Sequence, residues 1–174
     1  MDKFDVSLMI GSQSDYPIIE EAIKILDKFS IKYRLIVSSA HRTPNRTEKW
    51  VKFAEESGAK VFIVAAGAAA HLPGVVAAMT NLPVIGVPIA ATALNGVDAL
   101  YSIVQMPGGI PVATMAIGKA GARNAAIFAA QILSLSNVEL KMKLNNYRVE
   151  MKSNIVKQSE NLKIKNENVF IDFE

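Results

Sequence analysis

The six residues from Ser39 to Pro44 place an imidazole, a guanidinium, two hydroxyls and a proline side by side. An imidazole such as that of His41 exchanges protons near neutral pH, and a guanidinium such as that of Arg42 holds a phosphate or carboxylate through paired N–H donors. Thr43 and Pro44 also suit a helix start, as N-cap and first helical residue, and both interpretations can hold together. This stretch predicts proton transfer on a small anionic substrate.

Two other loops carry polar or unusually small residues. The stretch 11–15 offers serine hydroxyls and the carboxylate of Asp15, which suits ribose hydroxyls, although it also reads as an ordinary helix cap. The stretch 66–74 is made of small residues around His71, which would let a substrate lie against the backbone. The two histidines of the chain, His41 and His71, both follow predicted strands. We therefore expect both at one edge of the sheet.

Metal and cofactor chemistry is poorly supported by these motifs. A metal site formed by His41, His71 and Asp15 is conceivable, but it lacks the spacing of helical zinc motifs. Neither a phosphate-binding loop of the ATPase type nor a Gly-x-Gly-x-x-Gly turn follows the first strand. We therefore expect no metal and no cofactor, with neither ATP nor NAD bound.

The elements that must position these loops follow from the apolar pattern. Five short apolar segments alternate with segments whose apolar residues recur at helical spacing. This order predicts an α/β fold with a five-stranded parallel sheet, whose ligands bind beyond the carboxyl ends of the strands. The predicted strands are 6–10, 33–37, 61–65, 83–87 and 112–116, and the predicted helices are 14–29, 45–57, 72–80, 97–104, 120–135 and 138–162.

The chain is predicted to form a catalytic α/β domain over residues 1–136, followed by a C-terminal helix and tail over 137–174. No sixth strand is available for that long helix to cover, so we expect its apolar stripe to pack on neighbouring subunits. Packing on its own domain is the alternative. The stripe consists of Leu140, Leu144, Tyr147 and Met151.

Composition bounds the class of protein. The 174 residues are 51% hydrophobic and 20% charged, as expected of a globular domain with a covered sheet. The net charge is +3, but acidic residues interleave with the basic ones, so we expect no nucleic-acid partner. The chain has no cysteine, no apolar segment for secretion and no apolar run approaching the roughly 20 residues of a membrane span. We therefore expect a soluble, cytoplasmic protein without membrane contact.

Four motifs together carry a resemblance to a known family. They cover about residues 6–135, and they closely resemble the class I branch of the PurE family, the N5-carboxyaminoimidazole ribonucleotide mutases of purine biosynthesis. The motifs are Gly11-Ser12-Gln13-Ser14-Asp15, Ser39-Ala40-His41-Arg42-Thr43-Pro44, Ala69-Ala70-His71-Leu72-Pro73-Gly74 and Ser102-Ile103-Val104-Gln105-Met106-Pro107.

The resemblance implies a flavodoxin-like three-layer α/β/α domain assembled into a homo-octamer. It also implies an isomerase that binds a ribonucleotide and moves a carboxylate from its exocyclic nitrogen to carbon four of the imidazole. In the favoured family mechanism the carbamate loses CO2, which stays trapped while carbon four attacks it. Neither ATP nor a metal takes part in that reaction.

The resemblance also implies the roles of the site residues. His41 matches the catalytic histidine, which would protonate the departing nitrogen and later remove the ring proton. Two departures from the family pattern fall at Ala68, where a glycine is usual, and at 88–91, which is plainer than usual. The substrate-binding residues that the resemblance implies are Ser12, Asp15, Ser39, Arg42, Gly67, His71 and Leu72.

Two alternatives to this function remain open. The class II enzyme of the same family carboxylates aminoimidazole ribonucleotide with free CO2, but its hexapeptide lacks the Arg-Thr-Pro ending found at 42–44. A noncatalytic nucleotide-binding module is the other alternative, because flavodoxin-like domains serve many functions.

Overall fold

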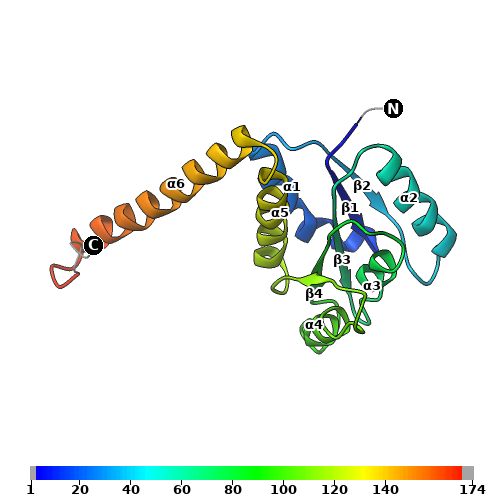
Figure 1. Ribbon diagram of the computed structural model, residues 1–174. Coiled ribbons are helices and arrows are strands. Elements are labelled where there is room, and N and C mark those ends of the chain that lie inside the picture. The colour runs from blue at the N-terminus through cyan, green and yellow to red at the C-terminus, as the bar shows by residue number, and fades with distance from the viewer. Residues whose placement is uncertain (1–2, 170–174) are drawn as a thin grey trace. The chain divides into compact units, whose positions relative to one another are not determined.

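Five parallel strands form one sheet between two layers of helices in the computed structural model, which describes residues 3–169 (Figure 1). The strand order is β2-β1-β3-β4-β5, the order of flavodoxin-like domains, so the predicted fold is confirmed. Strand β2 lies at one edge of the sheet and pairs with β1. The strands are β1 (Val6–Ile10), β2 (Tyr33–Val37), β3 (Val61–Gly67), β4 (Val84–Ile89) and β5 (Ala113–Thr114).

The helices alternate with the strands, as the spacing of apolar residues predicts. A short 3-10 helix, η1 (Gln13–Asp15), precedes the first α-helix. Residue ranges agree with the predicted ones within a few residues, and the bounds of β1, β2 and α4 are the predicted ones. The helices are α1 (Tyr16–Lys28), α2 (Pro44–Glu56), α3 (Leu72–Ala77), α4 (Val97–Val104), α5 (Lys119–Ser134) and α6 (Val138–Lys163).

Strand β5 contains two residues, so the predicted range 112–116 is wrong because it is too long. Only Ala113 and Thr114 pair with β4. The carbonyl of Pro88 in β4 points to the β5 side, where it accepts a hydrogen bond from the Gly118 N–H at 2.9 Å. Proline has no N–H to donate on that side, so the regular ladder between β4 and β5 ends early.

Helix α3 ends at Ala77, three residues before the predicted end at residue 80. The hydroxyl of Thr80 accepts a hydrogen bond from the Leu82 N–H at 3.1 Å. A threonine hydroxyl bonded to the backbone two residues on stabilises a turn in place of further helix. The chain therefore turns toward β4 sooner than its apolar pattern indicates.

The two faces of the sheet are covered by different helices. Helices α1 and α5 lie side by side on one face (Figure 1), where the Arg123 Nε lies 2.7 Å from the Glu21 carboxylate. Helices α2, α3 and α4 cover the other face and share one apolar core with the strands. Buried members of that core include Met9, Phe62 and Val64 from the strands and Val51, Val76 and Ile103 from the helices.

The chain divides into two compact units, at the boundary between residues 133 and 134. The second unit consists mainly of α6, whose N-cap Asn137 accepts a hydrogen bond from the Leu140 N–H at 3.0 Å. Leu140 is buried, whereas Met151 is 40% exposed. Subunit packing of this stripe stays a prediction, and residues 170–174 of the predicted tail lie outside the described residues. Within residues 3–169, no helix is both long and apolar enough to cross a membrane.

Candidate active site

A cavity of about 400 Å³ opens at the carboxyl edge of the sheet, where the strand order reverses between β1 and β3. Loops after β1, β2 and β3 form its wall, which is the position where open α/β sheets bind ligands. The structure thus brings together every residue that sequence reasoning selects as a site residue. These residues are Ser12, Asp15, Ser39, His41, Arg42, Gly67, His71 and Leu72.

The loop after β2 is held by its own hydroxyl groups. The Ser39 N–H donates to the Thr43 hydroxyl oxygen at 2.9 Å, and the Thr43 N–H donates to the Ser39 carbonyl at 2.9 Å. Thr43 and Pro44 are the N-cap and first residue of α2, as predicted, but the Thr43 side chain does not cap the helix. It closes the turn that contains His41 instead. The helix start and His41 therefore share one hydrogen-bonded turn.

The guanidinium of Arg42 bridges the loops that follow β1 and β2. Its Nε donates to the Ser39 hydroxyl at 3.4 Å, and its Nη2 donates to the Gly11 carbonyl at 3.5 Å. Both bonds are long, and an arginine has five N–H donors in total. No ion pair to Arg42 occurs among residues 3–169. Its charge is therefore available for an anionic ligand.

The two histidines meet above the cavity. The Nε2 atom of His41 lies 2.7 Å from the Nδ1 atom of His71, and the rings pack edge to face with centroids 4.8 Å apart. The two residues are 30 positions apart and come from the loops after β2 and β3. The prediction that both lie at one sheet edge is confirmed.

The loop after β1 forms a capping box around a buried carboxylate. The Ser12 N–H donates to Asp15 Oδ2 at 3.0 Å, and the Ser12 hydroxyl accepts a weaker bond from the Ser14 N–H at 3.4 Å. Asp15 Oδ1 has only a 3.5 Å contact with the Ser14 hydroxyl, so it is the oxygen available to a ligand. Burial raises the pKa of Asp15 above its ordinary value of 3.8, and hydrogen bonds from Ser12, Ser14 and Gly11 partly offset that rise.

Replacing Asp15 by asparagine should therefore stabilise the protein near pH 7. A raised pKa means that the native state binds the proton more tightly than the unfolded chain, so the ionised carboxylate is destabilising above that pKa. Wild type regains this stability as the pH falls through the raised pKa. We expect the advantage of Asp15→Asn, measured by urea unfolding, to shrink from about pH 7 to about pH 4. An advantage that grows on acidification would contradict this prediction.

The loop after β3 adopts a backbone that alanine rarely accepts. Ala68 and Ala70 have φ angles of 54° and 42°, in the left-handed region. Gly67 before them lies so close to the next loop that an added Cβ would stand 2.5 Å from the Ala91 Cβ. The methyl group of Ala68 is exposed at the rim of the cavity. The structure therefore accommodates this departure from the usual glycine through backbone strain.

Glycine at position 68 should relieve that strain. A left-handed conformation costs an L-residue roughly 1–2 kcal/mol, whereas glycine adopts it freely. Ala69 is a matched control, because it is also exposed in the same loop but has no positive φ. We expect Ala68→Gly to be more stable than Ala69→Gly by about 1 kcal/mol in urea unfolding. Equal stabilities would show that the conformation carries no cost.

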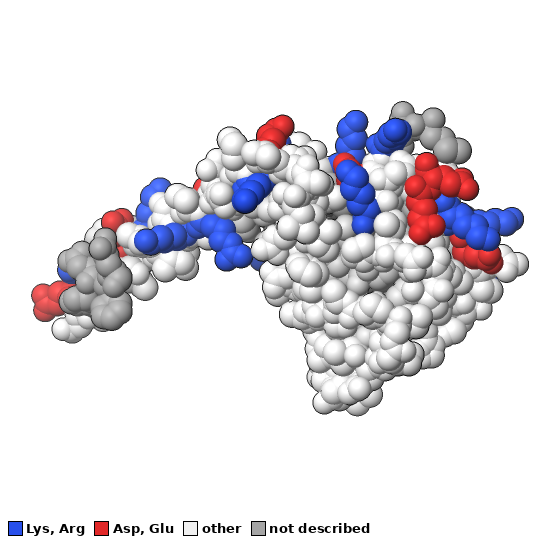
Figure 2. All heavy atoms as spheres, in the orientation of Figure 1, with Lys and Arg blue, Asp and Glu red and all other residues white. Residues whose placement is uncertain are grey.

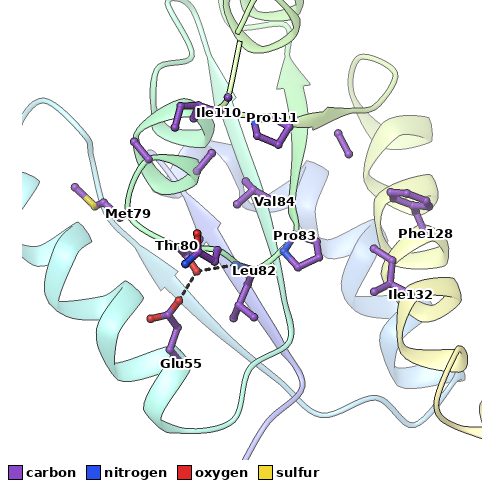
Figure 3. Close-up of a pocket in the computed structure, with 15 residues that line it drawn as sticks. Glu55, Met79, Thr80, Leu82, Pro83, Val84, Ile110, Pro111, Phe128 and Ile132 are labelled. Carbon is purple, nitrogen blue, oxygen red and sulfur yellow. Dashed lines mark hydrogen bonds between the residues drawn. The ribbon is translucent and has the colours of Figure 1, made fainter. Parts of the chain in front are cut away.

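A larger cavity, of about 760 Å³, lies at the opposite edge of the sheet, at the amino ends of β4 and β5 (Figure 3). Most of its lining residues are of apolar types, with Leu82, Pro83 and Phe128 among them (Figure 3). Glu55 is the one ionisable residue of that wall, and its carboxylate already accepts a hydrogen bond from the Thr80 hydroxyl. Size alone would favour this cavity, but the groups that can carry out chemistry lie in the smaller one.

Sequence reasoning missed some of the cavity wall. Ala91 from the loop after β4 lines it, whereas the lining residues Ala40 and Ala66 lie within the stretches 39–44 and 66–74 that the sequence singles out. The stretch 88–91, which lacks a polar side chain, thus forms part of the cavity wall through Ala91. An alanine has no polar group, so the sequence pattern does not mark it as a site residue. Ser14, noted for its hydroxyl, also belongs to the wall. No group of three or more His, Cys, Asp or Glu side chains within residues 3–169 is arranged to hold a metal ion.

Comparison with known proteins identifies relatives along most of the chain. A family model described as AIR carboxylase matches residues 5–154. The N5-carboxyaminoimidazole ribonucleotide mutase of Pyrococcus abyssi is 55% identical over 147 residues, or 84% of this chain and 83% of that protein. The mutase of the same name from Bacillus subtilis is 51% identical over 157 residues, or 90% of this chain and 97% of that protein.

Solved structures agree with these relatives. The crystal structure of a PurE2 variant of Treponema denticola matches with a TM-score of 0.84 at 29% identity, covering 94% of this chain and 99% of that one. A second crystal structure, Treponema denticola PurE, matches with a TM-score of 0.81 at 29% identity, covering 91% of this chain and 98% of that one. The fold, the motifs at the sheet edge and these relatives agree, and the chain belongs to the AIR carboxylase family, that of the PurE proteins.

Proposed function

We propose that the protein is a cytoplasmic mutase that converts N5-carboxyaminoimidazole ribonucleotide to 4-carboxy-5-aminoimidazole ribonucleotide in purine biosynthesis. The observation that carries the proposal is the convergence of three loops on one cavity of about 400 Å³. There, a histidine, an arginine and a buried aspartate line the cavity together with a run of small residues. The relatives that are about half identical are named for this reaction.

His41 is the proposed general acid and base. It protonates the exocyclic nitrogen as the carbamate loses CO2, and it removes the proton of carbon four after that carbon attacks the CO2. His41 gives one proton to the exocyclic nitrogen in the first step and regains another from carbon four in the second, so the reaction needs no external acid or base. The turn closed by Ser39 and Thr43 holds the backbone of His41 in place between the steps.

The other residues bind and confine the substrate. Arg42 offers paired donors to the 5′-phosphate, and Asp15 Oδ1 accepts from a ribose hydroxyl, with Ser12 and Ser39 as neighbouring polar contacts. The small-residue loop from Gly67 to Leu72 closes around the released CO2. Excluding water there keeps the CO2 beside carbon four long enough to be recaptured.

Turnover of the carbamate tests this proposal. Purified protein is mixed with N5-carboxyaminoimidazole ribonucleotide in a buffer that contains ¹³C-bicarbonate and a chelator but no ATP. We expect rapid formation of the carboxylated imidazole, and its carboxyl carbon should come from the carbamate and remain unlabelled. Labelled product from aminoimidazole ribonucleotide and bicarbonate, without consumption of the carbamate, would identify the class II reaction and refute the mutase assignment.

A homo-octamer is proposed as the working assembly. Helix α4 and the loop before it expose Leu94, Val97, Tyr101 and Val104, and the surface over α4 shows no charged side chain in the view of Figure 2. An apolar helix face of this kind is typical of a subunit contact. The stripe on α6 is a second candidate contact. Light scattering should give eight times the chain mass of 18.8 kDa, and a monomer would contradict the proposal.

A further inference from the structure

The geometry points to His71 as a positioning residue that holds the ring of His41 through a hydrogen bond and leaves His41 Nδ1 to act on the substrate. This inference rests on the proposed function of His41 as acid and base. It starts from the distance of 2.7 Å between His41 Nε2 and His71 Nδ1. That distance requires one N–H between the two nitrogens.

The backbone beneath His71 is fixed by its own helix. His71 is the N-cap residue of α3, its φ and ψ of −71° and −20° are helical, and its carbonyl accepts a hydrogen bond from the Val75 N–H at 3.0 Å. The turn before it is closed by a hydrogen bond from the Ala70 N–H to the Gly67 carbonyl at 3.0 Å. His71 thus presents Nδ1 from an ordered support.

His41 has one ring partner within residues 3–169, and that partner is His71. The turn around His41 fixes its backbone but not the rotation of its ring. A hydrogen bond at Nε2 determines both the direction of the ring and the nitrogen that remains available. His71 therefore fixes the rotation of the His41 ring, which the loop after β2 leaves undetermined.

The direction of the hydrogen bond follows from the proposed chemistry. An imidazolium has N–H groups on both nitrogens and can only donate. His41 in its acid form therefore donates from Nε2, and His71 Nδ1 must accept. After His41 gives up the proton on Nδ1, the same Nε2–H bond remains, and the lone pair on Nδ1 is ready to remove the proton of carbon four. His71 keeps its own proton on Nε2 throughout.

This assignment separates His71 from the residues that bind substrate. A residue that contacts the substrate in both ground state and transition state affects KM, whereas a residue that aims the acid and base affects kcat. We therefore expect His71→Phe, which removes the acceptor, to lower kcat by about 10- to 100-fold and to change KM by less than about threefold.

His71→Asn is the matched rescue. Its side-chain oxygen can accept near the position of Nδ1, so we expect it to recover most of the lost kcat. A KM increase with unchanged kcat in His71→Phe would make His71 a substrate-binding residue and overturn the inference. Failure of the asparagine to recover kcat more than the phenylalanine does would also overturn it, provided that both variants match wild type in thermal unfolding and assembly mass.

Nitrogen-15 spectroscopy of the imidazoles tests the inference without turnover. The chain has two histidines, so a His71→Asn sample assigns the signals of His41 by itself. At about pH 8.5, where histidine side chains are ordinarily neutral, we expect the His41 proton on Nε2 in wild type. A proton on His41 Nδ1 would overturn the inference. Failure of wild type to convert the carbamate would instead refute the proposed function, while the spectrum would still report the hydrogen bond.

Discussion

Replacing His41 by asparagine is expected to lower kcat by about 10²- to 10⁴-fold, the usual contribution of a general acid and base. Asparagine is similar in polarity but cannot take up and release a proton in this pH range. His41 is exposed at the rim of the cavity, so its loss should leave the core unchanged. The measurement is carbamate turnover at saturating substrate.

Binding provides the control for this variant. Arg42, Asp15 and the loop after β3 remain in place, so aminoimidazole ribonucleotide should bind His41→Asn within about threefold of wild type, because these groups supply the binding energy. The midpoint of thermal unfolding and the assembly mass should also match. Turnover within tenfold of wild type would remove His41 from the chemistry and favour a different proton donor.

Replacing Arg42 by glutamine is expected to raise KM by about 10- to 100-fold, because a charge-assisted bond to phosphate contributes roughly 1.5–3 kcal/mol. The effect on kcat should be smaller, since the phosphate lies away from the reacting carbon. Inorganic phosphate should compete with substrate for wild type and much less for the variant. Steady-state kinetics with and without phosphate give both results.

Arg46 provides a matched control on the first turn of α2. Its Nε donates to the Val37 carbonyl at 3.1 Å, and it is exposed outside the cavity. Arg46→Gln removes the same charge four residues away, so its KM should stay within about threefold of wild type, as expected for a screened surface charge. Equal effects of the two substitutions would mean that net charge attracts the ribonucleotide and that Arg42 makes no specific contact.

Much of the fold could be predicted because its pattern is local. Continuous apolar runs mark strands buried on both faces, and helical spacing marks the segments between them. Strand β5 was overestimated because its length depends on Pro88 of the neighbouring strand, which is distant in sequence. The predicted length of α3 is too great because the Thr80 hydroxyl bonds to the backbone and stabilises a turn in place of further helix.

The membership of the site was also predictable, whereas its internal contacts were not. Motifs at the carboxyl ends of β1, β2 and β3 must meet at one edge of a parallel sheet, which is why the selected residues line one cavity. The bond between His41 and His71 joins loops of two strands that β1 separates, so no local pattern indicates it. The left-handed backbone at Ala68 could not be predicted from the sequence, because alanine ordinarily avoids that conformation.

The edge position of β2 makes the site sensitive to errors in strand register. Strand β2 pairs with β1 and carries the His41 loop at its carboxyl end. A parallel strand advances about 3.3 Å per residue, and a slip of one residue also exchanges its two faces. Such a slip would displace His41 by more than the 2.7 Å that separates it from its partner nitrogen. Recovery of turnover after refolding therefore reports the register of an edge strand, which recovery of helical content would not reveal.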